Sequence, residues 1–230
     1  METINEKNTL AEIVTNDFRA AKVFKDAGLD FCCGGSKTLG EACDEKNLDK
    51  KIILQELDLL KMQAENHSQN FNEWELGFLA DYIVNSHHKY VIKALPDLLF
   101  YTQKIADVHG ENHPELIEVA VLFRKVSAEL QQHLKKEEEV LFPAIKRLSA
   151  GKLQEDILLA QSEILRMKGE HEFAGGAMDK INVMTGNYKV PDDGCNTYKV
   201  TFKLLEQFED DLHVHVHLEN NILYPKTLNL

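Results

Sequence analysis

The stretches His133-Leu-Lys-Lys-Glu137-Glu-Glu-Val-Leu141-Phe-Pro143 and His215-Val-His-Leu-Glu219-Asn-Asn-Ile-Leu223-Tyr-Pro225 share one pattern, with Glu four, Leu eight and Pro ten residues after the histidine. Positions four apart on an α-helix differ by about 40° around its axis, so the histidine and the glutamate of each stretch point the same way. Two such helices that face each other present two imidazoles and two carboxylates. The repeat therefore predicts a metal site between paired helices.

Helical periodicity continues along most of the remaining chain, and strand signals are sparse. The C-terminal part predicts four long amphipathic helices, at roughly 73–108, 114–148, 152–184 and 197–228. Short connections between such helices favour an antiparallel four-helix bundle. We therefore predict an all-α protein in which residues 73–230 form the bundle.

The N-terminal part predicts a small helical domain over residues 1–64. A polar stretch follows and suggests a linker at 65–72. With such a linker, the small domain can dock on its own bundle or on that of a second copy, so a homodimer stays open. The small domain is predicted to contain three helices. The first spans 10–27 and is ended by Gly28, the second is short and begins at a capping box in Thr38-Leu-Gly-Glu41, and the third spans about 50–64.

Composition excludes several classes of partner. The chain carries 26 basic and 38 acidic side chains, and its formal net charge of -12 repels nucleic acid and anionic membrane surfaces. No run of about 18 apolar residues and no N-terminal targeting pattern is present. We therefore expect a cytoplasmic globular protein that binds neither nucleic acid nor membrane.

Each predicted helix of the bundle carries a histidine within about a turn of its midpoint: His88, His133, His171 and His215. The midpoints of an up-and-down bundle lie at similar heights, so these side chains can meet in one layer. Next to His88, His87 competes for the same place, but His88 fits the apolar row of its helix slightly better. Four imidazoles with two carboxylates suit a pair of iron ions and also accept manganese or zinc.

Residues near these histidines refine the predicted site. The small residues Ala174 and Gly175 follow His171 and leave room beside a metal for a diatomic ligand. In the fourth helix, His213 and His217 point away from Glu219, because six and two residues correspond to rotations of about 240° and 200°. We therefore do not expect His213 or His217 to bind the metal.

The glycine-rich turn Asp30-Phe-Cys32-Cys33-Gly-Gly-Ser36 carries two adjacent thiols ahead of a predicted helix start. Backbone N–H groups and the helix dipole favour thiolate there, and a thiolate can accept iron, a nitrosyl group or a partner's thiol. A purely structural role in a tight chain reversal explains the turn equally well. Cys43 and Cys195 have no such setting, and we interpret them as incidental.

The bundle pattern resembles the hemerythrin-like family, and nearly the whole chain resembles the RIC proteins (repair of iron centres), which begin with an ScdA-like domain. The residues that carry this resemblance are Phe31-Cys-Cys-Gly-Gly35 with Thr38-Leu39, His88 eight before Pro96, Glu170-His171, and the repeat. Oxygen carriers of the hemerythrin-like family usually have a second histidine at the place of Gly175 and an Asp five after the fourth histidine. This chain departs at both places, which argues against reversible oxygen carriage without excluding it.

The resemblance implies two non-haem iron ions, bound by the four midpoint histidines and bridged by Glu137 and Glu219. His109 also matches a family histidine and is a candidate second-shell residue. Glu129 and Glu170 are candidates for a polar route to the centre, although solvated helix charges explain them as well.

The family further implies repair of iron–sulfur clusters after nitric oxide or oxidative damage, by iron donation to damaged cluster proteins and not by turnover in the usual enzymatic sense. Two alternatives stay open. One is a sensor or carrier of oxygen or nitric oxide, and the other is a redox enzyme that consumes nitric oxide.

Overall fold

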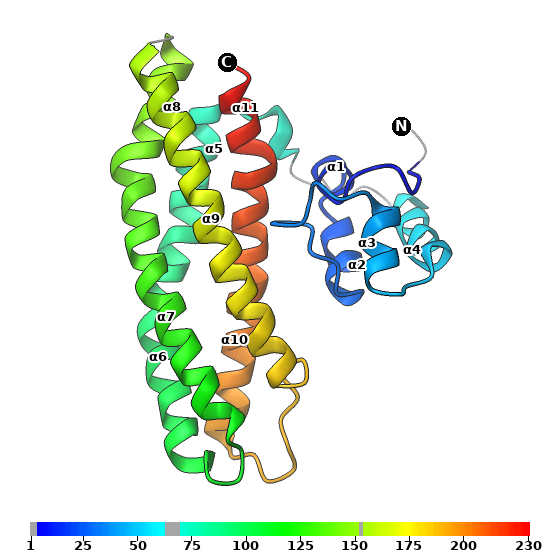
Figure 1. The fold of residues 1–230 in the computed structure, drawn as a ribbon, viewed down its shortest axis with the longest axis vertical. Coiled ribbons are helices and arrows are strands. Elements are labelled where there is room, and N and C mark those ends of the chain that lie inside the picture. Colours follow the sequence, from blue (N-terminus) through cyan, green and yellow to red (C-terminus); the bar gives the residue numbers. More distant parts are fainter. Residues whose placement is uncertain (1–3, 63–69, 152–153) are drawn as a thin grey trace.

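The computed structural model describes residues 4–62, 70–151 and 154–230, and these residues contain helices and no strand. Figure 1 shows a long helical bundle with a small helical domain at its side. The predicted all-α fold is confirmed. Most of the predicted linker at 65–72 lies outside the described residues, which include only its last three positions.

The small domain contains four helices: α1 (Leu10–Asn16), α2 (Ala20–Asp26), α3 (Leu39–Glu45) and α4 (Lys50–Met62). The capping box predicted at Thr38 and Glu41 is confirmed, since each residue's side chain bonds the other's backbone N–H. The single helix predicted at 10–27 is wrong. Asp17 takes an extended conformation, and its carboxylate accepts hydrogen bonds from the backbone N–H and the guanidinium of Arg19, which replaces helical hydrogen bonding there.

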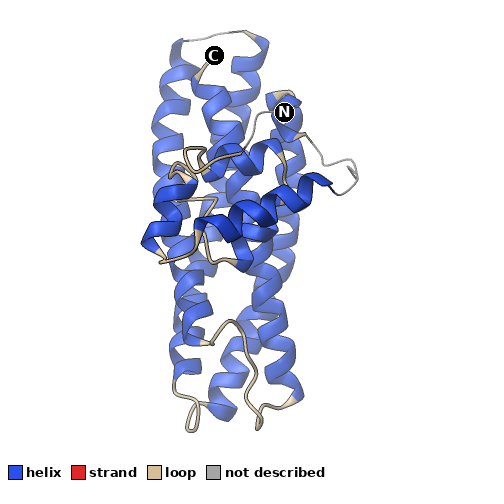
Figure 2. Ribbon diagram, turned by 90° about the vertical axis from the view of Figure 1, so that its right-hand side faces the viewer, coloured by secondary structure: helices blue, strands red, loops and turns tan. Residues whose placement is uncertain are grey.

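The bundle is built from long helices that run up and down side by side (Figure 2). Helix α6 packs against α7 and α10, and α9 packs against the same two helices. A short turn η1 (Phe71–Glu73) precedes the bundle. The elements of the bundle itself are α5 (Leu76–Ile83), η2 (Val84–His88), α6 (Lys89–His109), α7 (Glu115–Lys136), η3 (Glu137–Leu141), α8 (Phe142–Ala150), α9 (Gln154–Met184), α10 (Asn196–His217), η4 (Leu218–Leu223) and α11 (Tyr224–Leu228).

Three of the four predicted bundle helices are each interrupted by a π-helical turn: η2, η3 and η4. In η3 and η4 the N–H of the following residue bonds the carbonyl five residues earlier, at Glu137 and Glu219. Pro143 and Pro225 then stand in the first turn of α8 and α11. Proline has no N–H and clashes with the carbonyl four residues before it, so the wider π turn accommodates both prolines.

Buried apolar side chains form two clusters along the bundle, and the histidines and glutamates of the repeat lie between them. On α9, for example, Met167 belongs to one cluster and Ala174 to the other, with His171 between. On the fourth helix the change falls between Val216 and Leu218. A buried polar layer thus divides the apolar core. None of the helices in the described parts of the chain has both the length and the apolar character that crossing a membrane requires.

Candidate metal centre

The polar layer brings together all six residues that the sequence predicts as metal ligands. His88, His215, Glu137 and Glu219 form one group of ligand atoms within 4.8 Å of one another. His133 and His171 form a second group with the same two glutamates. Because both glutamates belong to both groups, the layer contains two adjacent sites, each with two imidazoles and two shared carboxylates.

The ring nitrogens that face the glutamates are all Nε2 atoms. In one group, His133 Nε2 lies 3.2 Å from Glu137 Oε2, and His171 Nε2 lies 3.2 Å from Glu219 Oε2. In the other, His215 Nε2 lies 3.0 Å from Glu219 Oε1 and His88 Nε2 lies 3.4 Å from Glu137 Oε2. Four imidazole nitrogens therefore converge on two carboxylates in the buried core.

The opposite ring nitrogen, Nδ1, has a hydrogen-bond partner in three of the four histidines. His88 Nδ1 lies 2.8 Å from Glu138 Oε1, and His171 Nδ1 lies 3.0 Å from Asn220 Oδ1. Glu138 and Asn220 occupy the same position of the repeat, one residue after the shared glutamate. Such partners fix the orientation and tautomer of a metal-binding histidine. Glu138 and Asn220 were not predicted as partners of these histidines, although both follow the glutamate of the repeat by one residue.

Glu170 holds the third histidine, at 2.9 Å from His133 Nδ1, and its other oxygen accepts a hydrogen bond from Lys136. Its neighbours lower its pKa to about 2, with the hydrogen bond from His133 as the largest cause. The hydroxyl of Tyr224, also missed from sequence, donates a short hydrogen bond to Glu137. Among the described residues, only His215 of the four has no hydrogen-bond partner at Nδ1.

The charge balance of the layer favours a cation. Glu137 and Glu219 are fully buried, and burial opposes their ionisation, yet the neighbouring histidines lower both pKa values. Burial lowers the pKa of His88 and His133, but Glu137 and Glu219 outweigh it and raise both to about 10. Two buried carboxylates are thus held as anions beside two protonated imidazoles, and a bound metal ion would supply that positive charge instead once the imidazoles lose their protons.

Besides His215 Nδ1, three buried atoms of the six predicted ligands have no hydrogen-bond partner among the described residues: His88 Nε2, Glu137 Oε2 and Glu219 Oε2. Such atoms are rare in folded proteins unless something else binds them. Nitrogen and oxygen donors of this kind suit iron, manganese or zinc. The residues present therefore fit a pair of such metal ions.

Other candidates from the sequence lie elsewhere. His87 Nδ1 lies 2.9 Å from Asp211 Oδ1, and its ring stacks on that of His215, but His87 belongs to neither group of ligand atoms. Glu129 is exposed on α7. His109 stands at the far end of α6, about 30 Å of helix beyond His88, where it cannot support the metal ligands directly.

The Cys32–Cys33 turn docks on the bundle beside the polar layer. The side-chain amide of Asn221 in η4 donates to the backbone oxygens of Phe31 and Cys32, at 3.0 and 3.2 Å. A Cβ at position 35 would lie 2.5 Å from the backbone oxygen of Phe31, so only glycine fits at this position. The structure thus explains this glycine by close packing, and neither Cys32 nor Cys33 forms a disulfide.

The expected thiolate is wrong for Cys32. Its Sγ lies 3.9 Å from Cys33 Sγ and donates a hydrogen bond to Asp30 at 3.2 Å. The contact with Cys33, burial and the Asp30 charge all raise its pKa. The turn also ends before the helix begins at Leu39, so the helix dipole does not reach Cys32.

Cys195, interpreted from sequence as incidental, has a defined setting. It caps α10, where its Sγ accepts a hydrogen bond from the Tyr198 N–H, and it lies 3.2 Å from His109 Nε2. The His109 contact, followed by the backbone hydrogen bond, lowers the pKa of this exposed thiol to about 7. The contact between His109 and Cys195 left no signal in the sequence, because the two residues are 86 positions apart.

Comparison with known proteins agrees with this geometry. Residues 79–227 match the hemerythrin HHE cation-binding domain, and residues 6–61 match ScdA_N, a domain of unknown function. The chain is 36% identical to the probable iron-sulfur cluster repair protein of Haemophilus influenzae, over 96% of each chain. It is 35% identical to the repair protein YtfE of Yersinia pestis over 91% of each chain. Its identity to the repair protein ScdA of Staphylococcus epidermidis is 30%, over 97% of this chain and 99% of that one.

Proposed function

Because this chain belongs to the hemerythrin HHE cation-binding family, and to the same family as the iron–sulfur cluster repair proteins that it matches along almost its whole length, we propose that it repairs iron–sulfur clusters. The proposed cofactor is a pair of non-haem iron ions held by His88, His133, His171 and His215 and shared through Glu137 and Glu219. The single observation that carries the proposal is that both glutamates belong to both groups of ligand atoms.

The proposed mode of repair is donation of iron to cluster proteins damaged by nitric oxide or oxidants. Bound iron would supply Lewis-acid and redox chemistry. A shared carboxylate has two oxygens, so it can hold one ion after it releases the other. Glu138, Glu170 and Asn220 keep three imidazoles oriented during such a change. The arrangement supports iron that is bound firmly but can leave.

The docked turn supports a further part of the proposal, in which Cys32 and Cys33 act as an acceptor next to the centre. Asn221 links the backbone of Phe31 and Cys32 to η4, the turn that begins one residue before Glu219. The neutral Cys32 thiol must lose its proton to bind a cation. A thiol role therefore predicts that Ser at both positions leaves the iron of the bundle in place and impairs repair.

The test is iron transfer under anaerobic conditions. The purified protein is expected to hold about two iron ions per chain, as the ligand set implies, and to lose iron in proportion to the cluster rebuilt on an apo iron–sulfur protein. Retention of all iron with reversible gas binding would support the sensor or carrier instead. Catalytic consumption of nitric oxide without iron loss would support the redox enzyme. A single zinc ion per chain would overturn the di-iron proposal.

A further inference from the structure

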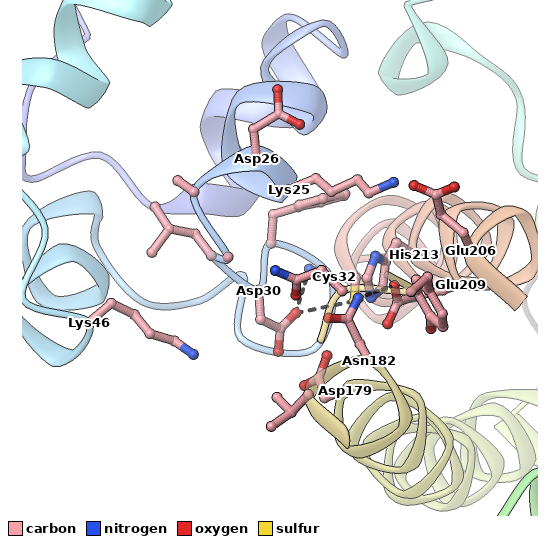
Figure 3. Close-up of a pocket in the computed structure, with 17 residues that line it drawn as sticks. Lys25, Asp26, Asp30, Cys32, Lys46, Asp179, Asn182, Glu206, Glu209 and His213 are labelled. Atoms are coloured by element: carbon pink, nitrogen blue, oxygen red, sulfur yellow. Dashed lines mark hydrogen bonds between the residues drawn. The ribbon is translucent and has the colours of Figure 1, made fainter. Parts of the chain in front are cut away.

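A second group of metal-ligating side chains lies on the outer side of the bundle, in a cavity of about 580 Å³ between α9, α10 and the small domain (Figure 3). Asp179 on α9 and Glu209 and His213 on α10 each offer one ligand atom, and these atoms lie within 4.8 Å of one another. Glu209 and His213 are four residues apart, so one face of α10 carries both. This face differs from the one that presents His215 to the polar layer.

Glu209 is the unusual member of the group, because it is a carboxylate only 2% exposed. Its one hydrogen bond in the described structure comes from the Asn182 amide, at 2.8 Å. Burial raises its pKa to about 7, and Asp179 adds to the shift. Lys25 and Lys46 line the same cavity and partly offset the two carboxylates, yet burial still raises the pKa of Glu209, so a divalent cation would add compensating charge where the carboxylate is buried.

Tyr188, a neighbour of Glu209, gives a second indication of a missing ligand. Its side chain lines the same cavity and is 8% exposed, and its hydroxyl has no hydrogen-bond partner among the described residues. Burial raises the pKa of the phenol, and the nearby Glu209 carboxylate raises it further. A buried hydroxyl without a partner marks a place where an ion or its bound water would fit.

The opposite wall of the cavity is the cysteine turn. Asp30 and Cys32 line it, and with Cys33 they form another group of potential ligand atoms within 4.8 Å of one another. The Phe31 ring packs on the His213 ring with centroids 6.1 Å apart. The cavity thus joins an oxygen and nitrogen donor set to the Cys32 thiol, whose sulfur lies 3.9 Å from that of Cys33.

We propose that Asp179, Glu209 and His213 form a second cation site, which holds a divalent first-row metal ion outside the six-residue centre and passes Fe²⁺ to or from the thiol turn, where Cys32 gives its proton to the Asp30 carboxylate when it binds the ion and takes it back when the ion leaves. Two carboxylates and one imidazole are a donor set that such ions accept. The site itself stands on the geometry of the cavity. Only its role in moving iron rests on the proposed function.

The test is a titration of iron-loaded, oxidised full-length protein with Mn²⁺, followed by electron paramagnetic resonance. The unmodified protein is expected to bind one Mn²⁺, which Fe²⁺ displaces because it binds such ligands more tightly. Asp179→Asn and Glu209→Gln should each weaken Mn²⁺ binding at least about tenfold, as loss of support at a metal site does. Glu172→Gln, an exposed carboxylate on the same helix as Asp179, is the matched control.

Equal Mn²⁺ binding in all four proteins, or none in the unmodified protein, would overturn the site. Asp179 is exposed, so its variant keeps the test valid if Glu209→Gln fails to fold. Iron content and the optical bands of the main centre are measured in the same samples. If Mn²⁺ binds as expected but the unmodified protein donates no iron, the proposed function fails and the second site remains. If Asp179→Asn loses Mn²⁺ but donates iron at the normal rate, the transit role is overturned.

Discussion

The thiol of Cys33 lies against Gly175 of helix α9, where a Cβ on the glycine would be 3.4 Å from the sulfur. Gly175 was expected to leave room for a diatomic ligand beside His171. The structure instead places a side chain of the small domain next to that room. The absent side chain at position 175 therefore serves the docking of the cysteine turn.

Gly175→Leu should displace the turn, because a longer side chain enters the volume of the Cys33 thiol. Cys32 is 4% exposed, so its alkylation requires undocking. We expect the alkylation rate of Cys32 to rise about tenfold or more, which corresponds to a loss of about 1.4 kcal/mol of docking free energy. Peptide mass spectrometry measures that rate. Gly175→Ala is the control, since 3.4 Å is an ordinary contact for a Cβ; equal protection of Cys32 in all three proteins would contradict the docking described above.

Glu137→Gln and His215→Ala should each reduce bound iron, because the first alters a carboxylate shared by both groups and the second removes an imidazole from one of them. Iron per chain should fall below that of the unmodified protein, with far-UV circular dichroism still helical. His217→Gln is the control, since this buried histidine contacts Asn221 and lies outside both groups. Full iron in both ligand variants would show that other residues bind the metal.

Glu170→Ala tests whether Glu170 orients His133, and it leaves all six proposed metal ligands unchanged. The variant loses the 2.9 Å contact to Nδ1, and iron affinity should fall about 10- to 100-fold. Competition with a chelator gives the affinity. Glu172→Ala, exposed on the same helix, should bind iron as the unmodified protein does; a Glu170 variant that matched it would mean that packing alone orients His133.

The repeat predicts so much of the site because its parts follow local rules. Helical spacing puts His133 and Glu137 on one face, and the helix midpoints bring four histidines to one height. The π turns were not predictable in the same way, since Pro143 and Pro225 indicate an interruption of the helix but not whether it is a kink, a break or a π turn. Only in three dimensions do Glu138 and Asn220 reach histidines of other helices.

Contacts between segments that are far apart in the sequence could not be predicted for a related reason. The docking of the cysteine turn depends on one amide, Asn221, whose partner oxygens are about 190 residues away in sequence. The break at Asp17 depends on a local competition, in which an aspartate bonds Arg19 instead of continuing the helix. Helical periodicity carries no signal for either choice.

Cys195 should be the most reactive thiol at neutral pH, because it is exposed and its pKa is lowered to about 7. The thiolate is the nucleophile, so its alkylation rate should rise with pH and reach half its maximum near pH 7. His109→Asn removes the largest cause of the shift, and the midpoint should then move up toward the ordinary thiol value of about 8.5. Rates are measured by quenched alkylation between pH 5.5 and 9.5, with Cys195→Ser identifying the reacting peptide. An unchanged midpoint in His109→Asn would assign the activation of Cys195 to the N-terminus of α10 alone.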